Sequence, residues 1–103
     1  MQRLQKIQEM LKNEPTDSFL NYVLALEYAK LNDVVKAIEL IEKLLTRDEG
    51  YLGAYYQLGC YYEQMGHLQN AIATYKKGIV IAKMKNNKKA EGELNEALGN
   101  VEC

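Results

Sequence analysis

The chain carries one pattern of side chains twice, as NYVLALEYAKLNDVVKAIELI at residues 21–41 and as YYQLGCYYEQMGHLQNAIATY at residues 55–75. Matching residues lie 34 positions apart: Leu24 with Leu58, Tyr28 with Tyr62, and Ala37 with Ala71. A fixed period of this length is typical of helical repeats that stack on one another. The repetition therefore predicts an all-α fold built from antiparallel helix pairs.

Apolar periodicity predicts about six helices and no strand, over residues 2–13, 17–31, 34–46, 51–65, 68–83 and 88–101. Two of them, 17–31 and 51–65, are apolar on two faces, so each is expected to lie between neighbouring helices. The last one has a single apolar stripe, as a terminal cap requires. Asn32 and Gly66, 34 residues apart, are expected to turn the chain between paired helices with positive φ angles.

Small side chains should let the paired helices approach closely. We expect Ala25 to face Ala37 in the first copy, and Gly59 to face Ala71 in the second. The spacing also assigns most of the eight tyrosines to the core. The core tyrosines are expected to be Tyr28, Tyr55, Tyr62 and Tyr75.

Length and charge favour one domain without a broad attraction to polyanions. The chain has 103 residues and a formal net charge of −1, whereas nucleic acids and anionic membranes attract clustered Lys and Arg. The lysines between Lys83 and Lys89 are followed by glutamates, so we interpret them as a solvated loop and helix start. Without a secretory signal or a membrane-spanning stretch, the chain is expected to be cytoplasmic, with no nucleic acid and no membrane as partner.

No motif for catalysis or for metal binding is present. The single histidine, His67, is expected to be solvated or to cap a helix, and the pairs Glu39/Glu42 and Glu93/Glu96 are interpreted as solubilising carboxylates. The two cysteines fit a reduced compartment, with Cys60 a small core or groove residue and Cys103 an exposed thiol. We therefore predict no enzyme activity, no catalytic residue, no cofactor and no metal.

The repeated residues resemble the tetratricopeptide repeat, whose pattern is W-x2-L-G-x2-Y…A-x3-F…P. The matches are Leu24-Ala25, Tyr28, Ala37 and Ile41, then Tyr55, Leu58-Gly59, Tyr62, Ala71 and Tyr75. The departures are Asn21 in the Trp position, Leu44 and Gly78 where Ala is usual, and Glu49 and Lys83 in place of proline. The resemblance implies a right-handed superhelix of helix pairs in one domain, residues 1–103. Its parts would be a half-repeat helix (2–14), two repeats (17–50 and 51–84) and a capping helix (88–101).

In the family that this chain resembles, the second face of the first helices lines a concave groove for a partner peptide or helix. The corresponding residues here are Phe19, Tyr22, Leu26, Lys30, Tyr56, Cys60, Glu63 and Gln64. The family's best-known subset clamps the C-terminal carboxylate of heat-shock chaperone tails with Lys and Asn. Tyr22 and Leu26 stand at the corresponding places, so an apolar or aromatic ligand is expected instead.

Two functions fit this surface. The first is a non-catalytic interaction module, an adaptor or scaffold that binds a peptide or helix of another protein. The alternative is a structural unit that self-associates as a homodimer through the same surface. The sequence leaves open whether helix 88–101 or a second chain covers these residues.

Overall fold

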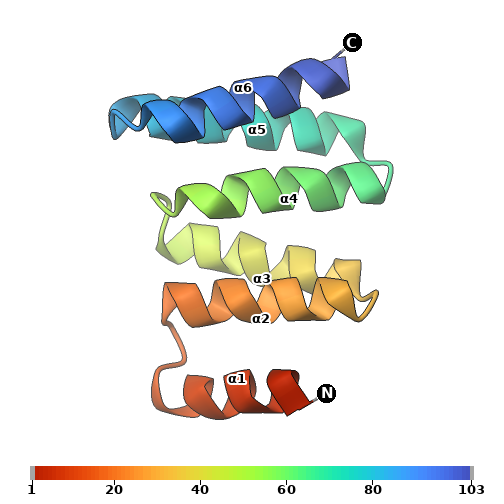
Figure 1. The fold of residues 1–103 in the computed structure, drawn as a ribbon, viewed down its shortest axis with the longest axis vertical. Helices are drawn as coiled ribbons and strands as arrows, with labels where there is room; N and C mark the ends of the chain where they lie inside the picture. The colour runs from red at the N-terminus through yellow and green to blue at the C-terminus, as the bar shows by residue number, and fades with distance from the viewer. Residues whose placement is uncertain (1, 103) are drawn as a thin grey trace. The chain divides into compact units, whose positions relative to one another are not determined.

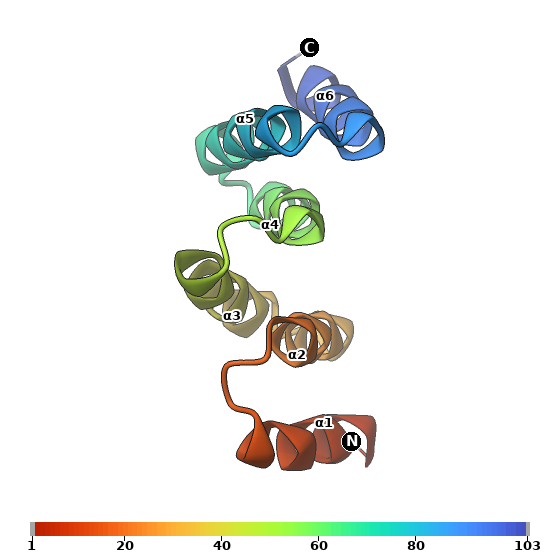
Figure 2. The same ribbon diagram turned by 90° about the vertical axis from the view of Figure 1, so that its left-hand side faces the viewer.

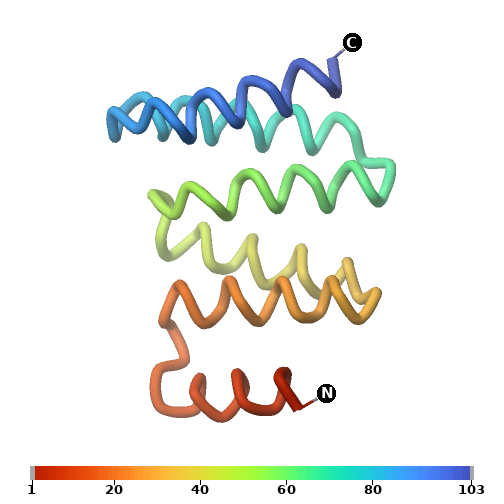
Figure 3. Tube along the Cα trace, viewed as in Figure 1, coloured from red at the N-terminus to blue at the C-terminus, as the bar shows by residue number. Residues whose placement is uncertain are grey.

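The structure, a computed structural model, describes residues 2–102, and these residues form six α-helices and no strand (Figures 1 and 3). The predicted all-α helical repeat fold is confirmed, and every helix end lies within one residue of its predicted position. The chain divides into two compact units, one ending at Asp48 and the other beginning at Glu49. Cys103, predicted to be an exposed thiol, lies outside the described residues.

In the first unit, α1 (Gln2–Asn13) and α3 (Val34–Arg47) both pack against α2 (Ser18–Lys30). Leu4 and Ile7 of α1 are buried together with Leu24 of α2, so the contact between these helices is apolar. In the hairpin of α2 and α3, Ala25 and Ala37 are both completely buried, as expected where two helices approach closely.

In the second unit, α5 (Leu68–Met84) packs against both α4 (Leu52–Gln64) and α6 (Lys88–Glu102). The helices α4 and α6 also contact each other directly, and Figure 2 shows the three helices of this unit nearly end on. Each helix contributes one of the largest fully buried side chains, namely Tyr55, Tyr75 and Leu94. This core fixes the distance between α4 and α6, which matters for the site described below.

The turns that follow α2, α4 and α5 have the same hydrogen-bonded geometry. Asn32, Gly66 and Asn86 have φ angles of 67°, 77° and 55°. The next backbone N–H donates to a carbonyl five residues back: Asp33 to Tyr28, His67 to Tyr62, and Asn87 to Ala82. This pattern is the Schellman motif, which satisfies the free carbonyls at a helix end. The positive φ predicted at Asn32 and Gly66 is confirmed, and Asn86 adds a third position.

The residues in the Trp position of the repeat, Asn21 and Tyr55, make equivalent hydrogen bonds with different side chains. The Asn21 amide is buried and donates to the carbonyl of Pro15 at 3.1 Å and to that of Asp17 at 2.8 Å. The Tyr55 hydroxyl donates to the carbonyl of Glu49 at 2.7 Å. Pro15 and Glu49 are themselves 34 residues apart, so both side chains fasten the same point of the preceding loop.

Gly59, which was expected to face Ala71, has a nearer neighbour on the same helix. A Cβ atom built on Gly59 would lie 2.1 Å from the ring of Tyr75, so Tyr75 is the nearest partner of this glycine. Tyr75 follows Ala71 by one helical turn, and its ring occupies the space that the missing side chain leaves. Gly78 has a similar role, since a Cβ there would lie 2.7 Å from Tyr55 and 3.0 Å from Leu94.

Candidate partner-binding site

The predicted site residues of the first unit lie on one side of α2. Phe19 is 62% exposed and Lys30 is exposed, whereas Tyr22 and Leu26 are half-buried. They follow one another at steps of three or four residues, as residues on one side of a helix do. The buried core residues of the same helix lie on its other faces, so this side is distinct from the core of the unit.

The predicted site residues of the second unit lie on α4. Tyr56 is 40% exposed and Gln64 is exposed, whereas Cys60 and Glu63 are half-buried. Most of this row is tied to the core by Tyr75 of α5. The Tyr75 hydroxyl donates to the carboxylate of Glu63 and lies 3.5 Å from the sulfur of Cys60, and its ring lies 6.4 Å from that of Tyr56.

Tyr75 therefore supports the α4 surface from the core side. Burial, and then the hydrogen bond to Glu63, raise the pKa of Tyr75 far above its ordinary value, so the phenol keeps its proton. The carboxylate of Glu63 is held by this donor and directed toward the core. Of the predicted residues on α4, Tyr56 is the exposed aromatic one, and Glu63 is bonded to the buried Tyr75.

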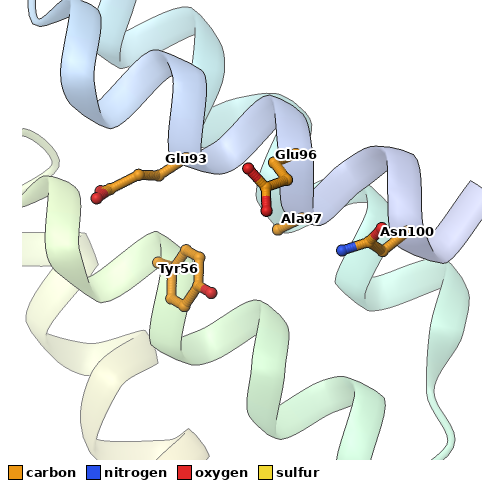
Figure 4. A pocket seen from close by; sticks show the side chains of 5 residues that line it. All are labelled: Tyr56, Glu93, Glu96, Ala97 and Asn100. Carbon is orange, nitrogen blue, oxygen red and sulfur yellow. The ribbon is translucent and has the colours of Figure 1, made fainter.

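Tyr56 lines a cleft of about 350 Å³ between α4 and α6. The other lining residues all come from α6, on consecutive turns: Glu93, Glu96, Ala97 and Asn100. Figure 4 shows Tyr56 on α4 and the row of lining residues on α6 across from it. Both walls belong to the second unit, and the core between α4, α5 and α6 holds them in place.

A second cleft of about 260 Å³ begins on the other side of Tyr56. Its lining is more apolar and includes Leu52 and Gly53 of α4 together with Ala90 and Leu94 of α6. Asn87, Lys89 and Glu93 complete it. Because Tyr56 and Glu93 line both clefts, the two are adjacent parts of one surface, which we call the α4–α6 groove.

Glu93 and Glu96, interpreted from the sequence as solubilising carboxylates, are indeed exposed, but they also line this groove, which was not predicted. The sequence contained a signal for them. With Leu94 in the position of Leu58, α6 follows α4 at an offset of 36 residues. At that offset Glu96 corresponds to Cys60 and Asn100 to Gln64, so α6 presents the same face as the first helix of a repeat.

The described residues show no arrangement for metal chemistry: among residues 2–102, no three His, Cys, Asp or Glu side chains could hold an ion. His67 is exposed at the start of α5, where its side chain makes no capping hydrogen bond. Within the same range, no helix is both long and apolar enough to cross a bilayer.

Comparison with known proteins shows which family the chain resembles. The family model for the tetratricopeptide repeat matches residues 20–51 and 52–83. A tetratricopeptide repeat domain protein from Salinibacter ruber is 37% identical in its solution NMR structure, over 86% of this chain and 90% of that one, with a TM-score of 0.83. Its crystal structure is also 37% identical, over 84% of this chain and 96% of that one, with a TM-score of 0.78.

The yeast Sti1 structure described as a TPR2B-domain:pHsp70-complex shares the fold. It is 20% identical, over 96% of this chain and 79% of that one, with a TM-score of 0.88. Among the curated proteins that were compared, none matches the chain. Repeats of this kind generally mediate interactions between proteins, and proteins that contain them are typically non-enzymatic adaptors. The two matched repeats cover more than half of the sequence, and the chain therefore belongs to the tetratricopeptide repeat family.

Proposed function

We propose that the protein is a non-catalytic interaction module that holds a peptide or helix of another protein in the α4–α6 groove. One observation carries the proposal. Tyr56, a large aromatic side chain, is 40% exposed inside a cleft of about 350 Å³ whose two walls belong to one packed unit.

An aromatic side chain in such a position suits binding for two physical reasons. It offers a large apolar surface with few rotatable bonds, so little conformational entropy is lost when a ligand covers it. Its ring also rests near the buried ring of Tyr75, so the binding surface exists before the partner arrives. Preorganisation of this kind lowers the cost of association.

The side of α2 that carries Phe19, Tyr22, Leu26 and Lys30 is proposed as a second contact surface. Phe19 is the most exposed aromatic side chain there, at 62%. The yeast Sti1 complex with pHsp70 supports the general proposal, because it shows that a domain with this fold takes part in a complex with another protein.

The experiment compares capture of partner proteins by the full chain and by single variants. Tyr56→Ala should reduce capture of a specific partner about tenfold or more, as expected for an aromatic residue at the centre of an interface. Val80→Ala removes an apolar group of α5 that is even more exposed, at 55%, and should leave capture unchanged. Equal losses in the two variants, or no loss in either, would contradict the proposal.

Sedimentation of the same proteins tests the alternative of self-association. A monomer at micromolar concentration is expected for the wild type. A dimer that Tyr56→Ala or Phe19→Ala converts to monomer would instead assign the surface to a second copy of this chain.

A further inference from the structure

We infer that the α4–α6 groove selects a partner segment in which a positively charged side chain, Lys or Arg, lies next to an apolar one. This inference rests on the proposed function, because it names the chemistry of the ligand at that same site. It goes further than the apolar or aromatic ligand expected from the sequence, since the charge comes from α6 and not from α2 or α4.

The charge of the groove is negative at one end. Glu93 and Glu96 are both exposed and lie about one turn apart on α6, where they line the cleft beside Tyr56. Within residues 2–102, neither carboxylate takes part in an ion pair or a side-chain hydrogen bond. The ion pairs of this unit use other residues, Lys77 with Glu49 and Lys76 with Glu102.

The lysine nearest in sequence does not neutralise this end. Lys89 lies one turn before Glu93 and lines only the second cleft, and it forms no ion pair with that carboxylate. Glu63, the other acidic residue of the surface, accepts a hydrogen bond from the hydroxyl of Tyr75 and is held toward the core. Two glutamates without a paired cation among the described residues therefore line the same cleft as Tyr56.

Tyr56 and Asn100 fit the same kind of ligand. The face of a tyrosine ring attracts a Lys or Arg cation, and most strongly where water is partly excluded. The Asn100 amide supplies a carbonyl oxygen that accepts from an ammonium or guanidinium group. A carboxylate or a phosphate at this place would meet two negative charges, so an acidic segment is disfavoured.

The apolar half of the ligand has its place in the second cleft. Leu52 and Gly53 on α4 and Ala90 and Leu94 on α6 form half of that lining. Tyr56 lines both clefts, so a segment that lies along the groove would place a cation on one side of the ring and an apolar group on the other. Each exposed ion pair changes a binding constant by less than about fivefold, so the carboxylates select the ligand more than they hold it.

The test uses synthetic peptides of equal length that differ only in charge. One interleaves arginine with leucine and phenylalanine, a second has glutamine in place of arginine, and a third has glutamate. Each is titrated into the full isotope-labelled chain and followed by amide NMR shifts. The arginine peptide should bind most tightly, with shifts centred on the residues of the groove. Its affinity should fall as salt is added.

Three variants separate the contributions. The double variant Glu93→Gln with Glu96→Gln should bind the arginine peptide about three- to tenfold more weakly. Its affinity for the glutamine peptide should be unchanged. The control is Glu39→Gln with Glu42→Gln, which makes the same change in net charge at the same spacing on α3. It should leave the affinity unchanged. Tyr56→Ala should weaken every peptide that occupies the groove.

The outcomes distinguish the two proposals. Equal affinity for the arginine and glutamine peptides, with both reduced by Tyr56→Ala, would overturn the charge preference and keep the groove as the binding site. Tighter binding of the glutamate peptide would also overturn it. If no peptide binds at about 1 mM, or if Tyr56→Ala leaves the affinity unchanged, both the preference and the groove as a binding site are rejected.

Discussion

Gly59 and Tyr75 form a contact that links the core of the second unit to its binding surface. The glycine leaves room for the tyrosine ring, and the tyrosine in turn contacts Tyr56, Cys60 and Glu63. A change in either residue is therefore expected to affect stability and surface together. This is a tighter constraint than the repeat pattern alone requires, since the pattern asks only for a small residue at this position.

Gly59→Ala should destabilise the protein by about 1–3 kcal/mol, because a Cβ at 2.1 Å from the ring of Tyr75 forces the ring or the helices apart. The control is Gly92→Ala in α6, where a Cβ would meet no atom within 4 Å. That variant should gain about 0.5–1 kcal/mol from the better helix propensity of alanine. Urea unfolding measures both, and equal effects would show that the crowding is absent.

Tyr75→Phe should lower the free energy of unfolding by about 1 kcal/mol at neutral pH, because Glu63 loses its hydrogen-bond donor. The pKa of Tyr75 is raised in the folded protein, so this contribution is fully present below pH 10 and is lost as the pH rises above 10. The difference between wild type and Tyr75→Phe should therefore narrow above pH 10. A constant difference from pH 7 to pH 11 would contradict the proposed state of the phenol.

The starts of matching helices differ between the two units, although the turns before α3 and α5 are alike. In the first unit, Asp17 accepts from the N–H of Leu20 and Asp33 from that of Lys36, so both helices begin with a side-chain cap. At the matching positions of the second unit, Tyr51 and His67 make no capping hydrogen bond. The helices α4 and α5 thus begin less favourably than α2 and α3, whereas α6 is capped by Asn87, whose side chain accepts from the N–H of Ala90.

His67→Asp should stabilise the protein by about 0.5–1 kcal/mol, because aspartate accepts from the free N–H groups at the start of α5. The reciprocal change, Asp33→Ala, should cost about 1 kcal/mol by removing the bond to Lys36. Thermal unfolding followed by circular dichroism would show shifts of several degrees in opposite directions. No rise for His67→Asp would mean that the ring of Tyr62, 6.3 Å from that of His67, already compensates for the missing cap.

Over the whole molecule, the 34-residue spacing and the apolar periodicity together were enough to predict the class of fold, the helix ends and the positive φ angles at Asn32 and Gly66. They worked because one face of each helix must be apolar and because a left-handed residue must follow a paired helix. The partner of Gly59 was not predictable, since the spacing identifies the face that turns inward but not which side chain fills it. Glu93 and Glu96 were missed because a single apolar stripe assigns them to solvent, and only the position of α4 places a wall opposite them.

The low net charge has a consequence at this same scale. With a charge of −1 and an isoelectric point near 5.8, mutual repulsion between copies is weak and vanishes at mildly acid pH. Solubility should therefore pass through a minimum near pH 5.8 and improve on both sides. Light scattering of the purified chain across pH 4 to 8 measures it, and a minimum far from pH 5.8 would show that folding has shifted the charge balance.

The two walls of the groove differ in how freely they can vary. The α4 wall is bound to Tyr75, so a substitution there disturbs the interior. On α6, by contrast, Glu93, Glu96 and Asn100 expose side chains that form no ion pair and no side-chain hydrogen bond among the described residues. Substitutions of these three residues should therefore cost little stability and act directly on recognition. Related proteins, or an engineer, could therefore change the preferred ligand by altering α6 while the opposite wall stays as it is.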